Sequence, residues 1–235
     1  MPDPTSGVHA HHRSVLVVED EPLLRELLGS ALERRDFEVV TAGSPSEARR
    51  AFRALDPDGI VMDVDLGPGP NGFDLAESLL AEETGAAVVF LTNLPDPRFA
   101  GRAADDLPPG IAYLRKSAVH DIDLLARTLD ATMRGAVDAQ IRHDRDPARP
   151  LSGLTHRQVE VLRLLALGYT NARIAETRGT TEKAVEKTVA RAMTVLGADA
   201  GADQNVRVAL ARQYAGLAGE PLPLPLHEEG DAPIP

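Results

Sequence analysis

The sequence predicts an α/β domain with a doubly wound, five-stranded parallel sheet, followed by an all-α domain of four helices. Two observations support this. Within residues 14–134, five short apolar runs of strand length alternate with segments whose apolar residues recur at helical spacing. Within residues 151–217, apolar residues recur only at helical spacing, between residues that typically begin and end helices. A chain of 235 residues is long enough for two domains with separate cores.

Composition excludes several classes of protein. The chain has no cysteine, which excludes disulfides and thiolate metal sites. It contains no apolar run long enough to cross a bilayer, so we expect no membrane partner. Residues 1–13 lack the apolar core of a signal peptide and are expected to be disordered. The sequence therefore predicts a soluble, cytoplasmic protein.

Charge is distributed unevenly along the chain. The formal net charge is −11, yet residues 150–217 hold nine basic and six acidic residues, a net +3. The tail, residues 218–235, is rich in proline and has four acidic residues and no Lys or Arg, so we expect it to be disordered. Residues 1–149 then carry a net −10. An anionic polymer is therefore expected to bind only the second domain.

The first domain is predicted to alternate strands and helices from end to end. The strands are expected at 14–18, 37–41, 60–63, 87–92 and 111–114. A first helix begins at Pro22, and others are expected at 44–55, 73–83 and 121–133, with a short, proline-broken helix at 99–105. This order predicts that ligand chemistry lies at the carboxyl ends of the parallel strands.

Charged and hydroxyl side chains follow four of these strands. The run from Gly59 to Asp65 is apolar until it ends in Asp63, while Glu19 and Asp20 follow the first strand. Thr92 ends the fourth strand and Lys116 follows the fifth. Clustered carboxylates repel one another and need a cation, and Mg²⁺ binds well to one or two carboxylates plus a phosphate oxygen. A single Asp at a strand end is more often a helix cap. Here, however, five charged or hydroxyl residues stand at four strand ends, which makes a shared site the better interpretation.

This combination also indicates a chemical reaction. A carboxylate can act as a nucleophile toward a phosphoryl group, whose charge is then stabilised by cationic and hydroxyl donors. Lys116 and Thr92 are residues of these two kinds.

Residues 14–134 resemble the receiver domain of response regulators. The resemblance implies that Asp63 is the phosphoacceptor, that a histidine kinase phosphorylates it, and that Thr92 is the switch hydroxyl beside the Lys116 ammonium. It also implies that Tyr113 is a switch aromatic, although an aromatic in a strand more often packs in the core. Mg²⁺ would be held by Glu19, Asp20, Asp63 and the backbone carbonyl of Asp65.

The same residues also allow a second interpretation, in which the protein is an enzyme. Asp63 and Asp65 also resemble the nucleophile motif of haloacid-dehalogenase-type phosphatases. That motif normally follows the first strand and its acidic pair comes late, whereas here Glu19 and Asp20 come first. We therefore expect no enzyme. Within the receiver resemblance, Lys116 is followed by Ser117 where many receivers have proline.

The second domain follows a linker predicted at residues 135–150, which is rich in charged residues and proline. Thr155 and Gln158 fit a capping box for a helix that ends near Gly168. Asn171 is expected to cap a short helix to Thr177, and Thr181 a helix to 196, followed by a fourth helix at about 204–217. The second and third helices form a helix-turn-helix.

Residues 152–217 resemble the LuxR-type DNA-binding domain. The resemblance implies that the third helix enters the major groove of double-stranded DNA and that the protein dimerises when phosphorylated. Two residues depart from that pattern: Glu186 stands where the family commonly has a basic residue, and Arg178 where it has an apolar one. The expected DNA contacts are Lys183, Lys187, Arg191, Thr181 and Arg173.

Together the two domains predict a response regulator of a two-component phosphorelay that regulates transcription. Glu186 leaves a second interpretation open, because a carboxylate near DNA phosphates is unfavourable. In that interpretation the receiver controls a helical domain that binds a protein in place of DNA.

Overall fold

The computed structural model describes residues 13–81, 85–102, 107–108, 110–197 and 206–218. The chain divides into two compact units, each of which is described by itself below. The first holds Met1–Thr92 and Leu107–His143, and the second holds Asn93–Asp106 and Asp144–Pro235. Among the described helices, none is both long and apolar enough to cross a membrane.

The first unit is built on a parallel sheet of order β2-β1-β3-β4-β5, as predicted. Its central strands are apolar on both faces because helices cover the sheet on both sides. Val15 and Val17 of β1, and Val89 of β4, are completely buried. The strands are β1 (Arg13–Val18), β2 (Phe37–Ala42), β3 (Gly59–Met62), β4 (Ala87–Thr92) and β5 (Ala112–Arg115).

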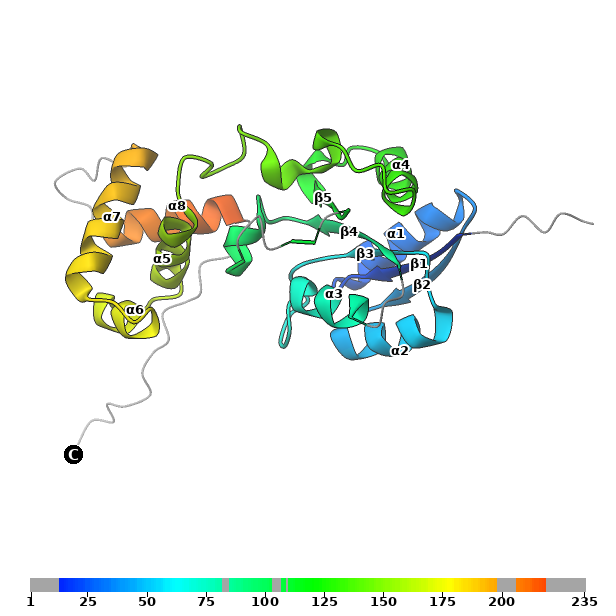
Figure 1. Ribbon diagram of the computed structural model, residues 1–235, viewed down its shortest axis with the longest axis horizontal. Coiled ribbons are helices and arrows are strands. Elements are labelled where there is room, and N and C mark those ends of the chain that lie inside the picture. Colours follow the sequence, from blue (N-terminus) through cyan, green and yellow to red (C-terminus); the bar gives the residue numbers. More distant parts are fainter. Residues whose placement is uncertain (1–12, 82–84, 103–106, 109, 198–205, 219–235) are drawn as a thin grey trace, which may run out of the picture. The chain divides into compact units, whose positions relative to one another are not determined.

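Two pairs of helices flank this sheet (Figure 1). Helices α1 (Pro22–Glu33) and α4 (Ile122–Met133) contact each other, and so do α2 (Pro45–Leu55) and α3 (Gly72–Leu80). Each begins where the sequence offers a start signal: proline in the first turn of α1, and side-chain caps from Ser44, Asn71 and Asp121 for the others. Buried Leu32, Leu125 and Leu129 join the strands in one core.

The described part of the helix predicted at 99–105 is not α-helical in the structure. The chain instead forms a single 3₁₀ turn, η1 (Pro97–Ala100), which Asp96 caps by accepting a hydrogen bond from the Arg98 amide. Gly101 ends this turn in the left-handed conformation, with φ of 80°. Proline at the first position and glycine after the fourth residue limit the described turn to residues 97–100. Residues 103–106 lie outside the described residues.

The range predicted as a linker contains two 3₁₀ turns, η4 (Ala139–Ile141) and η5 (His143–Arg145). Its first part packs on the first unit. Ile141 joins the core of the sheet, Arg142 forms a parallel bridge with Tyr113, and the backbone amide of Arg115 donates to His143 Nδ1 at 3.1 Å. These contacts lie beside β5, the edge strand of the sheet, and so cover part of that edge.

In its described residues, the second unit has four α-helices: α5 (His156–Ala166), α6 (Asn171–Thr177), α7 (Glu182–Leu196) and α8 (Val206–Ala218). The capping box of Thr155 and Gln158 is present, and Gly197 ends α7. The cap of α6 is Thr170, one residue before the predicted Asn171. The Asn171 side chain instead accepts a hydrogen bond from Arg207 of α8 at 3.0 Å. The part of the predicted fourth helix before residue 206 lies outside the described residues.

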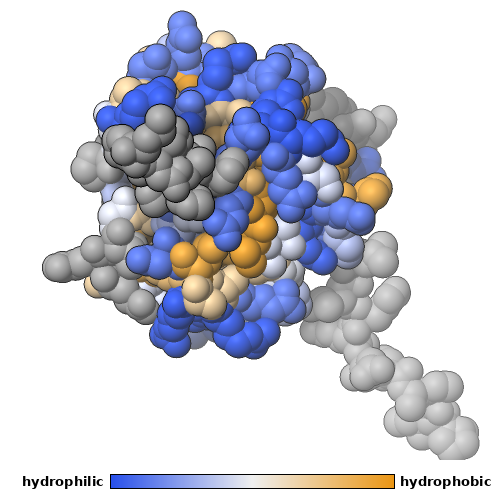
Figure 2. All heavy atoms as spheres, turned by 90° about the vertical axis from the view of Figure 1, so that its right-hand side faces the viewer, coloured by the Kyte–Doolittle hydropathy of each residue, from blue (hydrophilic) through white to orange (hydrophobic). Residues whose placement is uncertain are grey.

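Apolar side chains are not confined to the two cores. A space-filling view of one face shows a mainly hydrophilic surface with hydrophobic side chains gathered in a strip near its centre (Figure 2). On α1, Leu23 is 75% exposed and Leu27 is 59% exposed. Exposed leucines beside an ordered core are candidates for a contact with another protein.

Candidate functional site

Asp63 lies directly after β3 and is almost fully buried. Its backbone amide donates to the carbonyl of Val18 at 3.0 Å, which extends the pairing of β3 with β1 by one residue. One carboxylate oxygen, Oδ1, accepts a hydrogen bond from the Asp65 amide at 3.2 Å. The carboxylate is therefore held at the carboxyl edge of the sheet, as the alternation of strands and helices predicted.

Lys116 bridges two of the predicted acidic residues. It follows β5, and its Nζ lies 2.6 Å from Asp63 Oδ2 and 2.8 Å from Glu19 Oε2. The three side chains come from the ends of three different strands, so only the folded sheet brings them together. Charge-assisted hydrogen bonds of this length fix the orientation of both carboxylates.

Three carboxylates form an acidic pocket at this edge. Oxygen atoms of Glu19, Asp20 and Asp63 all lie within 4.8 Å of one another. Arg25 holds the backbone of the acid pair by donating to the carbonyls of Glu19 at 2.7 Å and Asp20 at 3.1 Å. Three carboxylates face a single ammonium, so the pocket attracts a further cation. Its oxygen donors fit a hard divalent ion such as Mg²⁺.

Burial and pairing shift the pKa values of two of these groups in the same direction. Burial raises the pKa of Glu19, and the Asp63 charge adds to that effect, while Lys116 opposes it. For Lys116, burial opposes the charged form, but the charge and hydrogen bonds of Asp63 and Glu19 outweigh it, so the pKa of Lys116 is raised. The ammonium therefore stays charged at neutral pH beside the Asp63 carboxylate.

Gly72 is a site residue that the pattern of strands and helices in the sequence did not single out. It begins α3 against the loop that carries Asp63. A Cβ atom at this position would lie 2.1 Å from the carbonyl oxygen of Asp63 and 2.9 Å from Val64 Cα. Only glycine fits here without moving the backbone of Asp63.

Of the other predicted receiver residues, Thr92 and Tyr113 lie on strands, while Asp65 lies in the loop after Asp63. Thr92 is buried at the end of β4, where it pairs with Arg115, the residue before Lys116. Tyr113 is fully buried, with its ring 6.3 Å from that of Phe90 and 6.5 Å from that of Phe73. Asp65 is exposed, and its carboxylate accepts only from the Gly67 amide at 3.3 Å among the hydrogen bonds of the described residues. The described chain has no cis peptide bond, so the link to Ser117 is trans.

Helix α7 of the second unit carries most of the predicted DNA contacts. Val185 and Ala192 face the core, which leaves the opposite face of the helix exposed. Thr181 caps α7 by accepting from the Ala184 amide at 3.2 Å, and Arg173 of α6 is paired with Glu176 at 2.5 Å. Glu186 is exposed on α7 together with three of the four predicted basic contacts, Lys183, Lys187 and Arg191.

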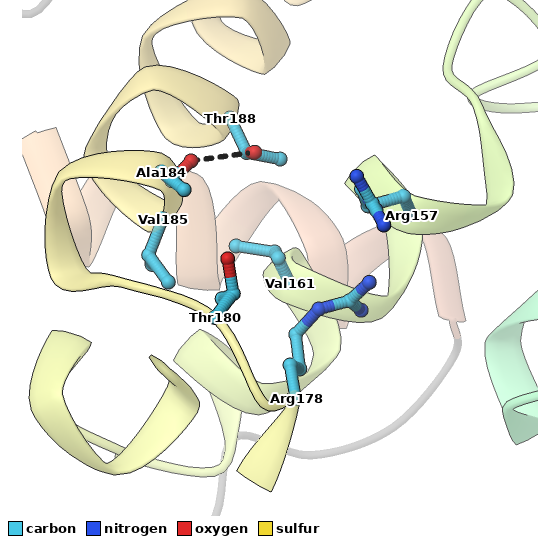
Figure 3. A pocket seen from close by; sticks show the side chains of 7 residues that line it. All are labelled: Arg157, Val161, Arg178, Thr180, Ala184, Val185 and Thr188. Atoms are coloured by element: carbon cyan, nitrogen blue, oxygen red, sulfur yellow. Dashed lines mark hydrogen bonds between the residues drawn. The ribbon is translucent and has the colours of Figure 1, made fainter. Parts of the chain in front are cut away.

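Arg178, which departs from the family pattern, has an acidic partner in α5. Its guanidinium donates to Glu160, and burial together with the nearby Arg157 charge lowers the pKa of Arg178. Both arginines line a small polar pocket of about 30 Å³ between α5 and the start of α7 (Figure 3). The Glu160 carboxylate compensates the charge of Arg178, which stands where the family usually has an apolar residue.

Comparison with known proteins agrees with this geometry. The family described as response regulator receiver domain matches residues 15–108, and the luxR family of bacterial regulatory proteins matches residues 152–204. The chain is 32% identical to the DNA-binding transcriptional activator DevR/DosR of Mycobacterium tuberculosis over 78% of this chain and 88% of that protein. The chain belongs to the response regulators. This response regulator is also 28% identical to the transcriptional regulatory protein LiaR of Bacillus subtilis, over 77% of this chain and 90% of that protein.

Solved structures support the fold of this response regulator. A structure of RcsB from Salmonella enterica serovar Typhimurium bound to a promoter has a TM-score of 0.55 at 19% identity. The alignment covers 87% of this chain and 98% of that one. The predicted fold, a doubly wound parallel sheet followed by a helical LuxR-type unit, is therefore confirmed.

Proposed function

We propose that a sensor histidine kinase phosphorylates this response regulator on Asp63 with Mg²⁺ as cofactor, and that the phosphorylated protein binds double-stranded DNA as a homodimer. The observation that carries the proposal is the contact of Lys116 Nζ with both Asp63 and Glu19 at the edge of the sheet. A lysine held there neutralises charge on a phosphoryl group attached to Asp63.

The reaction is a phosphoryl transfer. A carboxylate oxygen of Asp63 forms a bond to phosphorus while the bond from phosphorus to the donor's histidine nitrogen breaks. Lys116 supplies positive charge, and the Thr92 hydroxyl donates to a phosphoryl oxygen once the group is in place. Glu19, Asp20, Asp63 and the Asp65 carbonyl would hold Mg²⁺, which supplies further charge neutralisation when bound.

Selection of DNA fragments tests the function as a whole. The purified protein is incubated with fragmented genomic DNA, with and without Mg²⁺ and beryllofluoride, a mimic of the phosphoryl group, and bound fragments are sequenced. We expect enrichment of a two-fold symmetric site only with the mimic, because a dimer reads two half-sites. No enrichment by folded protein in either state would contradict DNA binding.

Glu186 favours the alternative function, in which the helical unit binds a protein. The residue is exposed on the helix expected to face DNA, and a carboxylate is repelled by phosphate. Binding of a protein partner only with beryllofluoride, together with a negative DNA selection, would support this alternative.

A groove beside the phosphorylation site is a suitable surface for the kinase. It has a volume of about 360 Å³, lies between α1 and the start of α4, and reaches Lys116. Its lining is mostly apolar, and it includes Leu24, Leu27, Leu91 and Ile122. An apolar surface next to the acceptor allows a partner to dock and present its phosphohistidine.

We expect Leu27→Glu to slow phosphotransfer from the cognate kinase by at least about tenfold, because a charge is placed in the docking surface. The rate is measured with a panel of sensor kinases from the source organism. Phosphorylation by acetyl phosphate should be unchanged, since a small donor needs no docking. Leu167→Glu, an exposed leucine of the second unit, is the control. Equal loss with both donors would instead indicate damage to the site.

A further inference from the structure

The segment that follows Thr92 belongs to the second unit. Thr92 ends β4 in the first unit, yet residues 93–106 cluster with residues 144–235. In the described part of this segment, the turn η1 contacts α5. The chain therefore passes into the second unit immediately after the predicted switch hydroxyl.

A buried carboxylate anchors this segment. Asp96 is completely buried and accepts hydrogen bonds from Arg98 Nε at 2.9 Å and from Arg149 Nε at 2.9 Å. Arg98 also donates to the carbonyl of Leu151 at 3.2 Å and to that of Leu154, just before α5. One carboxylate thus holds two guanidiniums. Removing one partner from such a buried cluster is costly, because a charge is left unpaired.

A second contact joins the same segment to α8. The ring of Phe99 stacks on that of Tyr214, with centroids 5.1 Å apart and planes at 20°. The Tyr214 hydroxyl donates to the Phe99 carbonyl at 3.2 Å. Both residues are almost fully buried. Stacking and burial of two aromatic rings hold η1 on this helix.

The connection from Thr92 to this anchor is short. Three residues, Asn93, Leu94 and Pro95, separate Thr92 from Asp96, so the two Cα atoms are four steps along the chain and at most about 14 Å apart. Proline also fixes one backbone torsion within it. A displacement of Thr92 is therefore passed to the anchored segment with little slack.

We propose that residues 93–101 form a transmission segment that carries the phosphorylation signal from Thr92 to α8. When Thr92 moves to donate to the phosphoryl group, the segment is drawn with it, and the Phe99 contact with Tyr214 weakens. Packing of α8 on the second unit then changes. The Asp96 cluster holds the segment on the second unit, so a displacement of Thr92 reaches that unit through this segment. The inference rests on the proposed phosphorylation of Asp63 and adds the route by which that event reaches the helical unit.

Hydrogen exchange of the full chain tests the transmission segment, with Mg²⁺ and beryllofluoride present or absent. In the unaltered protein we expect the mimic to change amide protection in the loop after Asp63, in residues 96–101 and in α8. In Asp96→Asn, the change in the Asp63 loop is retained and the change in α8 is lost. An equal response of α8 in Asp96→Asn and in the unaltered protein would overturn the proposal.

A milder pair of variants covers the case in which Asp96→Asn does not fold. Tyr214→Phe keeps the ring but removes the bond to the Phe99 carbonyl. We expect it to speed exchange in α8 by roughly two- to tenfold without the mimic and to reduce the response to the mimic. Tyr169→Phe, at an exposed tyrosine, is the matched control and should change neither. Identical behaviour of both tyrosine variants would contradict the role of Tyr214.

The same measurement separates this inference from the proposed function. If the mimic changes protection around Asp63 but not in residues 96–101 or α8 of the unaltered protein, phosphorylation stands and the transmission segment fails. If the mimic changes nothing, including the Asp63 loop, the receiver does not bind it and both proposals fall.

Discussion

Asp63→Asn is expected to take up no phosphoryl group from acetyl phosphate, whereas Asp65→Asn should be phosphorylated. The amide of asparagine is not a nucleophile at neutral pH, and no other carboxylate of the described acidic pocket has the same contact with the Lys116 ammonium and the same position after β3. The Asp65 carboxylate is exposed, and its substitution leaves the predicted carbonyl ligand in place. Incorporation of phosphate is measured by mobility on a phosphate-binding gel.

Two further readings of this experiment identify the chemistry. An acyl phosphate on Asp63 is cleaved by hydroxylamine, and EDTA should abolish its formation because the cluster of acids needs a cation. If the Asp63→Asn variant still takes up phosphate at a single residue, and hydroxylamine does not release that phosphate, then a residue other than Asp63 is the acceptor. Uptake in EDTA at the normal rate would argue against Mg²⁺.

The acidic pocket could be predicted from sequence because parallel topology determines where strand ends lie. The third strand was predicted at 60–63 and is observed at Gly59–Met62, and β4 is observed where it was expected. Once the order of strands and helices was clear, Glu19, Asp63 and Lys116 had to meet at one edge. Their contacts depend on topology more than on the details of side-chain packing.

The Asp96 cluster could not be predicted in this way. Arg98 lies two residues from Asp96, but Arg149 lies more than fifty residues away and comes from a range interpreted as linker. Nothing in local propensity indicates that such residues pair, because the partner is brought by tertiary packing. The same limit explains Arg178, whose partner Glu160 comes from a different helix. It also explains Gly72, whose need for glycine arises from the neighbouring loop.

Errors at helix starts have a local cause. Thr170 and Asn171 are adjacent, and both residue types are good caps. The structure uses Thr170 because its extended backbone places the hydroxyl toward the Arg173 amide, while Asn171 is engaged by Arg207. Sequence alone does not distinguish two suitable neighbours, and the choice follows from a contact with α8.

The second large effect is expected for Glu186→Lys, which should bind nonspecific duplex DNA more tightly and with a stronger dependence on salt. Glu186 is exposed on α7 beside Lys187, so a carboxylate is replaced by an ammonium on the face expected to lie near phosphates. One added phosphate contact steepens the slope of log affinity against log salt by about one. Titration at several salt concentrations measures that slope.

A charge change of the same size away from α7 is the control. Glu26→Lys alters an exposed residue of α1 and gives the protein the same net charge, so it separates a local contact from a general electrostatic effect. If Glu186 accepts a hydrogen bond from cytosine in the groove, Glu186→Lys should also lose preference for the selected site while gaining nonspecific affinity. If neither affinity nor slope exceeds that of Glu26→Lys, α7 does not face phosphate, and the helical unit is better explained as a surface that binds protein.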